Sequence, residues 1–374
     1  MTEQNTTGGN NAGQYQAGGN RTGHGKREQN KALWLAKRSA PFEAGPAQVT
    51  APAANEVVVR VRAVAVNPID SLHGVQFLAV VPWLQFPAVV GSDVAGEVVE
   101  VGSGVTRLKP GDRVLGHAVG IEKSHNRAAE GAFQHYTVLL EHLVSAIPGT
   151  LSYEQASVLP LTLSTAATGL FQQDHLGLAL PVADPPERSE TVLVWGGSTS
   201  VGSNAIQLAR NAGYRVVTTA SPHNFDYVKS LGAAEAVDYH SSTAVDELVE
   251  RIGTSPLAGA LAIGRRSLAP SVAIAAKVPG RKRVTSAQPE RVVRLRSPRA
   301  RRPGVHVSGI WGGTLKDNEV GPAIYAGFLP GALASGAYRA APEAVVVGEG
   351  LEAIPDAIRQ LRSGVSAKKL VVTL

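Results

Sequence analysis

The stretch ETVLVWGGSTSVG, residues 190–202, decides the fold of this 374-residue chain. Its first half is a largely apolar run, which is typical of a strand buried on both faces. Its second half is rich in glycine, and the amphipathic pattern over residues 205–212 that follows predicts a helix. A strand that passes through a glycine turn into a helix indicates a dinucleotide-binding unit.

The glycine spacing supports this interpretation. Against the pattern G-x-G-x-x-G, Gly197 and Gly202 occupy the first and third positions, and Thr199 replaces the second. The glycines allow a tight turn and close helix–strand packing, and the amides at the helix start face a pyrophosphate. We expect the phosphate contacts from Gly197, Thr199, Ser200, Val201 and Gly202. A glycine turn without a ligand is the alternative.

Strand and helix patterns alternate after this turn. Further strands are expected over residues 214–220, 237–239 and 258–263. Before the turn, helices are expected over 153–159 and 164–172. After it, one helix is expected to follow the strand at 214–220 and end at 229, and another is expected over 245–251. Such alternation predicts an α/β fold with a parallel sheet and right-handed crossovers.

The end of the second strand indicates which dinucleotide binds. An acidic residue there would hold a ribose 2′-hydroxyl and repel a 2′-phosphate. The chain instead has Ser221, Pro222, His223 and Asn224, with no acid before Asp226. NADPH is therefore favoured over NADH, and the alternative is a Ser-Pro turn that only caps a helix.

Residues 31–144 have a different pattern of apolar residues and turns. Short apolar strands, such as those within 57–64 and 91–102, are separated by glycines and by a Pro-Gly-Asp turn at 110–112. This pattern predicts a small, strongly curved antiparallel domain. Residues 1–28 contain no Leu, Ile, Val, Phe or Trp, so we expect a disordered tail there, with a binding arm as the alternative.

One segment, 265–305, fits the α/β pattern poorly. Within it, residues 277–302 carry ten Lys or Arg and one acid, Glu290. The chain has a net charge of +6, so the remainder carries about −3, which is ordinary for an enzyme. We expect a solvated, partly disordered insertion without a strand, or a shifted reading frame. A nucleic-acid partner is not expected, because no aromatic residue lies among the charges.

Absent residue types exclude several functions. The chain has no cysteine, which excludes disulfides, iron–sulfur clusters and thiolate zinc sites. It has no apolar run of about 18 residues and no apolar leader, so neither a membrane span nor secretion is expected. The expected location is the cytoplasm.

Five motifs in order carry a resemblance to a known superfamily. They are NPID at 67–70, GSDVAG at 91–96, KPGDRV at 109–114, GAFQHY at 131–136 and the glycine turn. Together they resemble the zinc-independent medium-chain dehydrogenase/reductase superfamily. SPHNFD at 221–226 and DY at 238–239 look most like its fungal branch of trans-acting enoyl reductases and proteins labelled zinc-binding oxidoreductases.

The resemblance covers about residues 30–264 and 309–374 and implies two domains. A GroES-like catalytic domain would comprise 29–160 and 313–374. A Rossmann NADP-binding domain with a doubly wound sheet would comprise 161–312, including the atypical basic segment. Zinc-using relatives place metal ligands at positions that look like Asn67, Ser92 and Leu161 here, which is no competent ligand set, so no metal is expected.

The resemblance also implies roles for residues. Those beside the nicotinamide end would be Asn67, Pro68, Ile69 and Asp70. Those around the adenosine 2′-phosphate would be Ser221, Pro222, His223, Asn224 and Tyr239, while Ala262 and Ile263 would border the cofactor. Those lining the acyl or quinone cleft would be Gly131, Ala132, Phe133, Gln134, His135, Tyr136, Thr137 and Val138. Tyr239 as a half-buried strand residue, and residues 131–138 as an ordinary turn and strand, are the alternatives.

Three functions remain open. The first is NADPH-dependent, metal-free reduction of an activated C=C bond in an enoyl thioester or enone. The second is quinone or aldehyde reduction on the same scaffold. The third is a catalytically impaired dinucleotide-binding partner protein. The catalytic acid stays unassigned, with His73 as one candidate. A polyketide synthase or carrier protein is a candidate partner, and a monomer or homodimer is expected.

Overall fold

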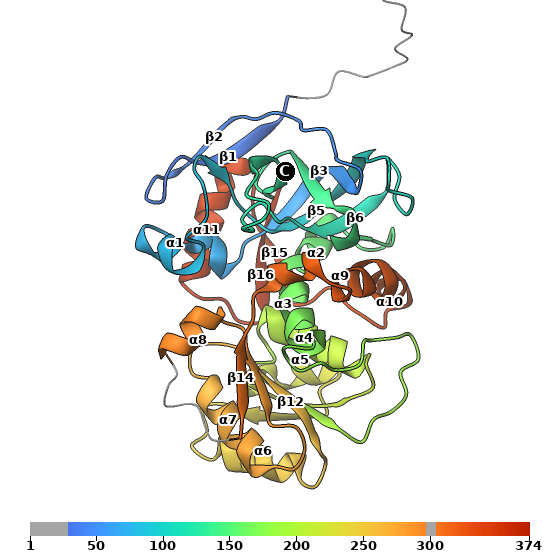
Figure 1. Cartoon of the computed structure of the whole chain (residues 1–374), viewed down its shortest axis with the longest axis vertical. Coiled ribbons are helices and arrows are strands. Elements are labelled where there is room, and N and C mark those ends of the chain that lie inside the picture. Colours follow the sequence, from blue (N-terminus) through green and yellow to red (C-terminus); the bar gives the residue numbers. More distant parts are fainter. Residues whose placement is uncertain (1–28, 297–303) are drawn as a thin grey trace, which may run out of the picture.

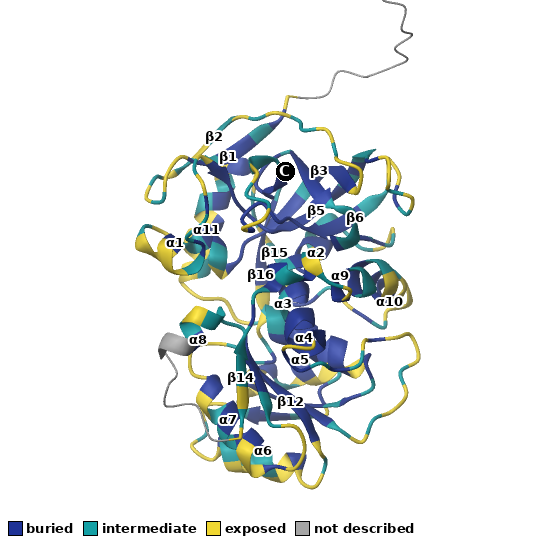
Figure 2. Cartoon of the chain, viewed as in Figure 1, coloured by how far each residue is buried: buried dark blue, intermediate teal, exposed yellow. Residues whose placement is uncertain are grey.

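The computed structural model describes residues 29–296 and 304–374, which form two lobes stacked along the long axis (Figure 1). The tail predicted at 1–28 lies outside the described residues. Sheets form the buried centre of each lobe, and exposed residues gather on helices and loops (Figure 2). Within the described ranges, every helix is too short or too polar to cross a lipid bilayer.

The lower lobe contains a six-stranded sheet whose order is β11-β10-β9-β12-β13-β14. Its strands are β9 Thr191–Trp195, β10 Arg215–Ala220, β11 Glu235–Asp238, β12 Leu257–Ala262, β13 Arg283–Ser286 and β14 His306–Gly309. All neighbouring pairs are parallel. The chain runs outward from β9 in one direction and then restarts at β12 in the other, so the sheet is doubly wound and a cleft opens where the direction reverses.

Helices cover both faces of this sheet. They are α3 Pro160–Phe171, α4 Ser200–Arg210, α5 Phe225–Ser230, α6 Ala244–Ile252, α7 Leu268–Lys277 and α8 Glu290–Arg296. Val192 and Val194 of β9 belong to one core cluster, and Leu193 and Trp195 belong to another. Because successive strand residues point to opposite faces, the apolar run quoted first is buried against both helical layers.

The upper lobe is built on a seven-stranded sheet. Its strands are β3 Glu56–Ala65, β5 Asp93–Val101, β6 Arg113–His117, β7 Tyr136–Leu140, β8 Val144–Ala146, β15 Glu343–Glu349 and β16 Lys368–Thr373. A three-stranded sheet adds β1 Lys31–Leu35, β2 Phe42–Pro46 and β4 Ala88–Val89. β16 pairs antiparallel with β3, so the C-terminal residues return to the first lobe. The predicted α/β class, with a doubly wound parallel sheet in one lobe and a largely antiparallel sheet in the other, is confirmed.

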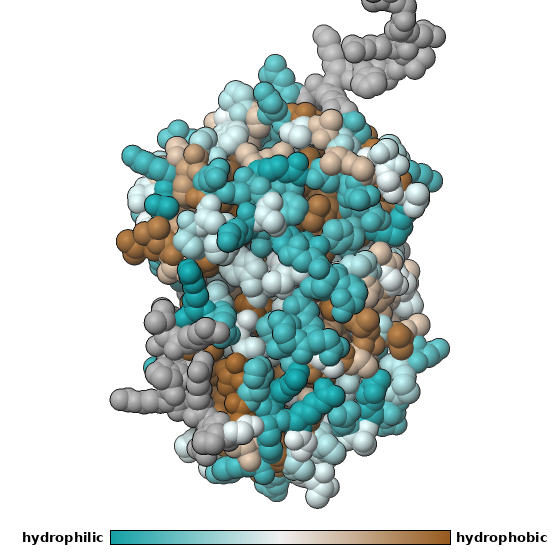
Figure 3. Space-filling view, in the orientation of Figure 1, coloured by the Kyte–Doolittle hydropathy of each residue, from teal (hydrophilic) through white to brown (hydrophobic). Residues whose placement is uncertain are grey.

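Short helices complete the upper lobe and the connection. They are η1 Pro68–Ser71, α1 Val75–Val80, η2 Ala128–Glu130, η3 Glu141–Leu143, α2 Tyr153–Ser157, η6 Gly312–Asp317, α9 Val320–Pro322, the π-helical η7 Ala323–Phe328, α10 Leu329–Ser335, η8 Leu351–Ala353 and α11 Ile354–Arg362. α1 buries Phe77 but exposes Val75 and Leu78. Figure 3 shows hydrophobic side chains at the edge of the upper lobe, where Figure 1 places α1.

The prediction that the insertion at 265–305 contains no strand was wrong. This segment supplies α7, β13 and α8, and β13 lies between β12 and β14. Its arginines cap the chain that follows α3: Arg281 donates to the carbonyl of Leu176 (3.1 Å), and Arg283 to those of Gln173 (3.0 Å) and His175 (2.8 Å). Cations stabilise carbonyl-rich helix ends. Residues 297–303 lie outside the described ranges.

The division of the chain into domains at residues 160/161 and 312/313 stays a prediction. The strands of the six-stranded sheet all come from residues 191–309. Those of the upper sheets come from residues 31–146 and 343–373. The predicted limits lie between these intervals.

Candidate active site

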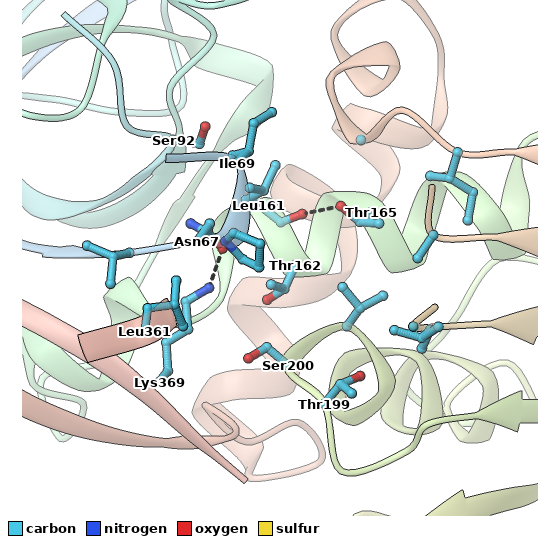
Figure 4. Close-up of a pocket in the computed structure, with 18 of the residues that line it drawn as sticks. Asn67, Ile69, Ser92, Leu161, Thr162, Thr165, Thr199, Ser200, Leu361 and Lys369 are labelled. Carbon is cyan, nitrogen blue, oxygen red and sulfur yellow. Dashed lines mark hydrogen bonds between the residues drawn. The ribbon is translucent and has the colours of Figure 1, made fainter. Parts of the chain in front are cut away.

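A cavity of about 640 Å³ lies between the two lobes and is called the cleft cavity here. Ser198, Thr199, Ser200 and Val201 line its lower side, at the carboxyl end of β9. Asn67 and neighbouring residues of η1 line its upper side, together with the start of β16. Figure 4 shows Thr199 and Ser200 below and Asn67 above. A crevice at this position is where doubly wound sheets bind dinucleotides.

The glycines of the turn are required by close backbone approach. A Cβ at Gly197 would lie 2.2 Å from the Thr218 Oγ1, and one at Gly202 would lie 2.2 Å from the carbonyl oxygen of Gly196. Gly196 itself has φ +91°, which only glycine adopts readily. The backbone of the turn therefore carries no side chain at these glycines beside the cleft cavity. This leaves room for a diphosphate to approach the backbone amides.

Thr199, which stands at the second glycine position, acts as the cap of α4. Its Oγ1 accepts a hydrogen bond from the Gly202 amide (3.0 Å) and donates one to the Gly196 carbonyl (2.7 Å). The hydroxyl proton is therefore already used within the turn. The amides at the start of α4, which have no partner inside the helix, are the groups that remain for an anion.

Seven of the predicted cofactor residues line the cleft cavity: Asn67, Pro68, Ile69, Thr199, Ser200, Val201 and Ile263. Asp70, Gly197, Gly202 and Ala262 lie behind this lining. Asp70 is buried and accepts a hydrogen bond from the Asn67 amide (2.7 Å), which closes the η1 turn. Its role in the structure is therefore to hold Asn67 in place.

A buried ion pair, which sequence analysis missed, lies beside Asn67. The Lys369 ammonium lies 3.1 Å from Asp93 Oδ2 and donates to Asn67 Oδ1 at 2.5 Å, as Figure 4 shows. Asn67 Nδ2 donates to Asp93 Oδ2 (2.8 Å), and the Leu161 amide donates to Asp93 Oδ1 (2.6 Å). Lysine at the start of an apolar strand was the signal in the sequence, but its partner lies 276 positions away.

These residues do not fit a zinc ion. Leu161 offers no donor atom, and the Asn67 amide is already bound to Asp93 and to the Lys369 cation. Among residues 29–296 and 304–374, no three His, Asp or Glu side chains are grouped so that they could hold a metal. Zinc independence stays a prediction.

His117 is a second buried polar group in the lining of the cleft cavity. Tyr325 donates to the Pro160 carbonyl (2.7 Å), so Ser164 donates to Tyr325 (2.8 Å) and His117 Nδ1–H donates to Ser164 (2.9 Å). His117 Nε2 is then an acceptor without a proton. Burial lowers the pKa of His117 to about 4, although Asp93 opposes the shift, so the ring is neutral at pH 7.

The pH dependence of stability should reveal His117 and Asp70 with opposite signs. Burial raises the pKa of Asp70 to about 7, so the folded state takes up its proton first and gains stability as pH falls from 7 towards 4. His117, with its lowered pKa, costs stability as pH falls from 6.5 towards 4. In urea unfolding, and relative to the wild type, Asp70→Asn should lack a gain in stability of about 4 kcal/mol on acidification, and His117→Gln should lack a loss of about 3 kcal/mol. Parallel curves for the two variants would contradict this assignment.

The predicted adenosine residues are only partly brought together. Ser221 Oγ donates to the Tyr239 hydroxyl (3.2 Å), and Tyr239 is 42% exposed. Tyr239 also lines a second cavity of about 560 Å³, with Trp195, His240 and Arg266 among its other lining residues. Arg266 and His240 were not predicted from the sequence. They add a guanidinium and an imidazole group to the lining of the second cavity.

His223 and Asn224 face the other lobe. His223 Nε2 lies 3.4 Å from Ser366 Oγ, and Asn224 Nδ2 donates to the same hydroxyl (3.1 Å). Ser366 belongs to the loop between α11 and β16. These two residues therefore connect the lobes at the mouth of the cleft, and Pro222 is exposed beside them.

The residues predicted to line the substrate cleft lie elsewhere. Residues 131–138 line neither the cleft cavity nor the second cavity. Ala132 and Phe133 are buried in the upper core, and Gln134 and Thr137 hold the η2 turn by bonding to the carbonyls of Ala128, Ala129 and Gly131. Residues 131–138 have the structure that was the alternative expectation, a turn followed by the start of a strand. His73, the candidate acid, is exposed and does not line the cleft cavity.

Comparisons with known proteins decide the family. Residues 53–149 match the family described as "Alcohol dehydrogenase GroES-like domain", and residues 200–324 match "Zinc-binding dehydrogenase". The "Dehydrogenase orf1" of Aspergillus niger is 51% identical over 322 residues, which cover 86% of this chain and 92% of that relative. The chain belongs to the medium-chain dehydrogenase/reductase superfamily. This medium-chain enzyme is therefore an oxidoreductase with a fold that binds NAD(P) and a small-molecule substrate.

Two further matches bear on this medium-chain enzyme. The "Trans-enoyl reductase himH" of Aspergillus japonicus is 35% identical over 347 residues, which cover 92% of this chain and 97% of that relative. The crystal structure of CurK enoyl reductase matches with a TM-score of 0.69 and 21% identity, and covers 92% of this chain and 99% of that one. At that identity the structural likeness shows the fold alone.

Proposed function

We propose that this oxidoreductase uses NADPH to reduce an activated C=C bond, as in an enoyl thioester or enone, without a metal. The observation that carries the proposal is the cleft cavity itself. It has a glycine turn on one side and a buried Asn67–Asp93–Lys369 cluster on the other, in which Asn67 stands at a position that looks like that of a zinc ligand in relatives. The relative named trans-enoyl reductase supports the same chemistry.

The lining of the cleft cavity suits an acyl chain. Ile69, Leu72, Val80, Ile121 and Ile310 give it apolar walls, and apolar walls with few polar groups are usual for small-molecule sites. When bound, NADPH would supply the hydride. The chain's own residues would hold the diphosphate at the start of α4 and exclude water between the lobes. A polyketide synthase or carrier protein that presents the acyl thioester is part of this proposal, with the enzyme acting as a monomer or homodimer.

The preference for NADPH is proposed from the adenosine end. Ser221 and Tyr239 offer hydroxyls, and Arg266 adds a positive charge nearby. A 2′-phosphate carries charge that such groups bind well. Tyr239 is exposed and has room to reorient toward a ligand.

One experiment tests both parts. NADPH and NADH consumption should be followed with a crotonyl-type thioester, an enone and a quinone as acceptors, and binding of both nucleotides should be titrated. We expect turnover of the thioester or enone and NADPH binding at least about tenfold tighter than NADH. Tyr239→Phe should narrow that ratio, whereas Tyr153→Phe, on α2, should not. Turnover of the quinone alone would favour quinone reduction, and binding without any turnover would favour an impaired partner protein.

A further inference from the structure

Glu122 is a carboxylic acid that lines the cleft cavity and has no assigned role. It follows β6 in the chain, and its residue is 6% exposed. Its amide donates to the Val119 carbonyl (2.9 Å), which fixes the main chain in a tight turn. A carboxyl group buried in an apolar cavity is costly unless it is bonded or functional.

Trp311 holds this carboxyl group. The indole N–H of Trp311 lies 3.0 Å from Glu122 Oε1 and 2.8 Å from Oε2. Trp83 packs edge-on against Trp311 with ring centroids 6.0 Å apart, and its own N–H donates to the Ile121 carbonyl (2.9 Å). One N–H serves two oxygens, so one oxygen can accept from Trp311 while the other carries a proton.

Two adjacent glycines place Glu122 close to α3. A Cβ at Gly313 would lie 2.0 Å from Glu122 Oε1, and a Cβ at Gly312 would lie 2.7 Å from Thr165 Oγ1. Thr165 in turn donates to the Leu161 carbonyl (2.8 Å), as Figure 4 shows. Only this Gly-Gly pair therefore separates the Glu122 carboxyl group from the first turns of α3, where Leu161 and Thr165 also line the cleft cavity.

The surroundings favour the protonated acid. Burial raises the pKa of Glu122 above its ordinary value, and Asp317 raises it further. The hydrogen bond from Trp311 and the charges of Lys316 and His125 oppose this increase in the pKa without cancelling it. Glu122 therefore holds a proton to higher pH than an exposed glutamate does.

We propose that Glu122 is the proton donor of the reduction, an assignment that rests on the proposed function. The β-carbon of the acceptor receives hydride from the reduced dinucleotide, and the electrons of the C=C bond move toward the α-carbon and its carbonyl. The O–H bond of Glu122 breaks as its proton forms the new C–H bond at the α-carbon. The carboxylate, still bonded to Trp311, then takes a proton from water.

Two histidines, His117 and His73, are less suitable than Glu122 as proton donors. His117 directs its one proton to Ser164 and presents an acceptor to the cleft cavity. His73 is exposed outside the cleft cavity. Glu122 is thus the acid that combines a proton, burial and contact with the cavity.

The first test is Glu122→Gln, which keeps an acceptor for Trp311 and loses the acid. Because general acids contribute roughly 100-fold or more, kcat should fall about 100-fold while KM and the Kd for NADPH stay within about threefold. Glu187→Gln, an exposed glutamate on the loop before β9, is the matched control and should leave kcat unchanged.

The pH profile separates an acid from a structural residue. In the wild type, kcat should fall as pH rises through the pKa of Glu122. Lys316→Met removes a charge that lowers this pKa, so the descending limb should move to higher pH. Glu122→Gln should lack that limb.

A measurement without turnover completes the test. The chain has four tryptophans, so the indole N–H signal of Trp311 can be assigned by NMR with Trp311→Phe. It should titrate with pH in the wild type and be flat in Glu122→Gln. An active wild type with unchanged kcat and pH limb in Glu122→Gln would overturn the Glu122 assignment alone. A wild type that reduces no acceptor would overturn the reductase proposal, and the role of Glu122 with it.

Discussion

Gly202→Ala is expected to weaken dinucleotide binding strongly and to lower the free energy of unfolding by about 3 kcal/mol. The added methyl group would lie 2.2 Å from the Gly196 carbonyl oxygen and 2.7 Å from the Gly197 Cα. Both neighbours are backbone atoms of the tight turn, so they cannot rotate away as a side chain would. Displacing α4 from β9 would also move the amides that face the diphosphate. Titration with NADPH should show affinity weaker by on the order of 100-fold.

Gly331→Ala provides the matched control for this variant. Gly331 lies in α10, and a Cβ there would meet no atom within 4 Å. Because alanine is a better helix former than glycine, this change should stabilise the protein by about 0.5–1 kcal/mol. If Gly202→Ala binds NADPH as tightly as Gly331→Ala does, the glycine turn is not the diphosphate site.

The Rossmann lobe could be predicted from sequence because its signals are local. The strand at 190–195, the glycine turn and the helix after it are adjacent in the chain; β9 forms as predicted, and α4 begins five residues before the predicted 205–212. Hydrophobic period and turn chemistry suffice where neighbours in sequence are neighbours in space.

The prediction for the basic segment 265–305 failed for a physical reason. β13 has only four residues, begins with Arg283 and has a partner strand on each side. Its stability comes from tertiary pairing and from arginines that bind carbonyls of residues 173–177, none of which periodicity detects.

The polar groups of the cleft cavity were missed for a related reason. Glu122 meets Trp311 across 189 positions, and His117 meets Ser164 across 47. Each residue alone is an ordinary glutamate or histidine in the sequence. Only the folded lobes place them on one cavity, so motif matching indicated the glycine turn but neither Glu122 nor His117.

Lys369→Met is expected to cost about 3–5 kcal/mol of unfolding free energy, because it leaves a buried carboxylate without its cation. Asp93 is fully buried, and Lys369 is 4% exposed. The methionine fills much of the same volume but cannot bond to Asn67 Oδ1 or Asp93 Oδ2. Asn67 lines the cleft cavity, so its side chain should become mobile and the catalytic rate should fall with stability.

A double variant and a surface control isolate the ion pair. Lys369→Met combined with Asp93→Asn should recover most of the lost stability, because neither buried charge remains. Lys277→Met removes the partner of Asp246 in a pair whose side chains are 48% and 74% exposed. Exposed pairs contribute little, so this control should cost less than about 0.5 kcal/mol in urea unfolding. Equal losses for Lys369→Met and Lys277→Met would show that the cluster beside Asn67 is open to solvent, and a metal-free polar site enclosed between the lobes would then be untenable.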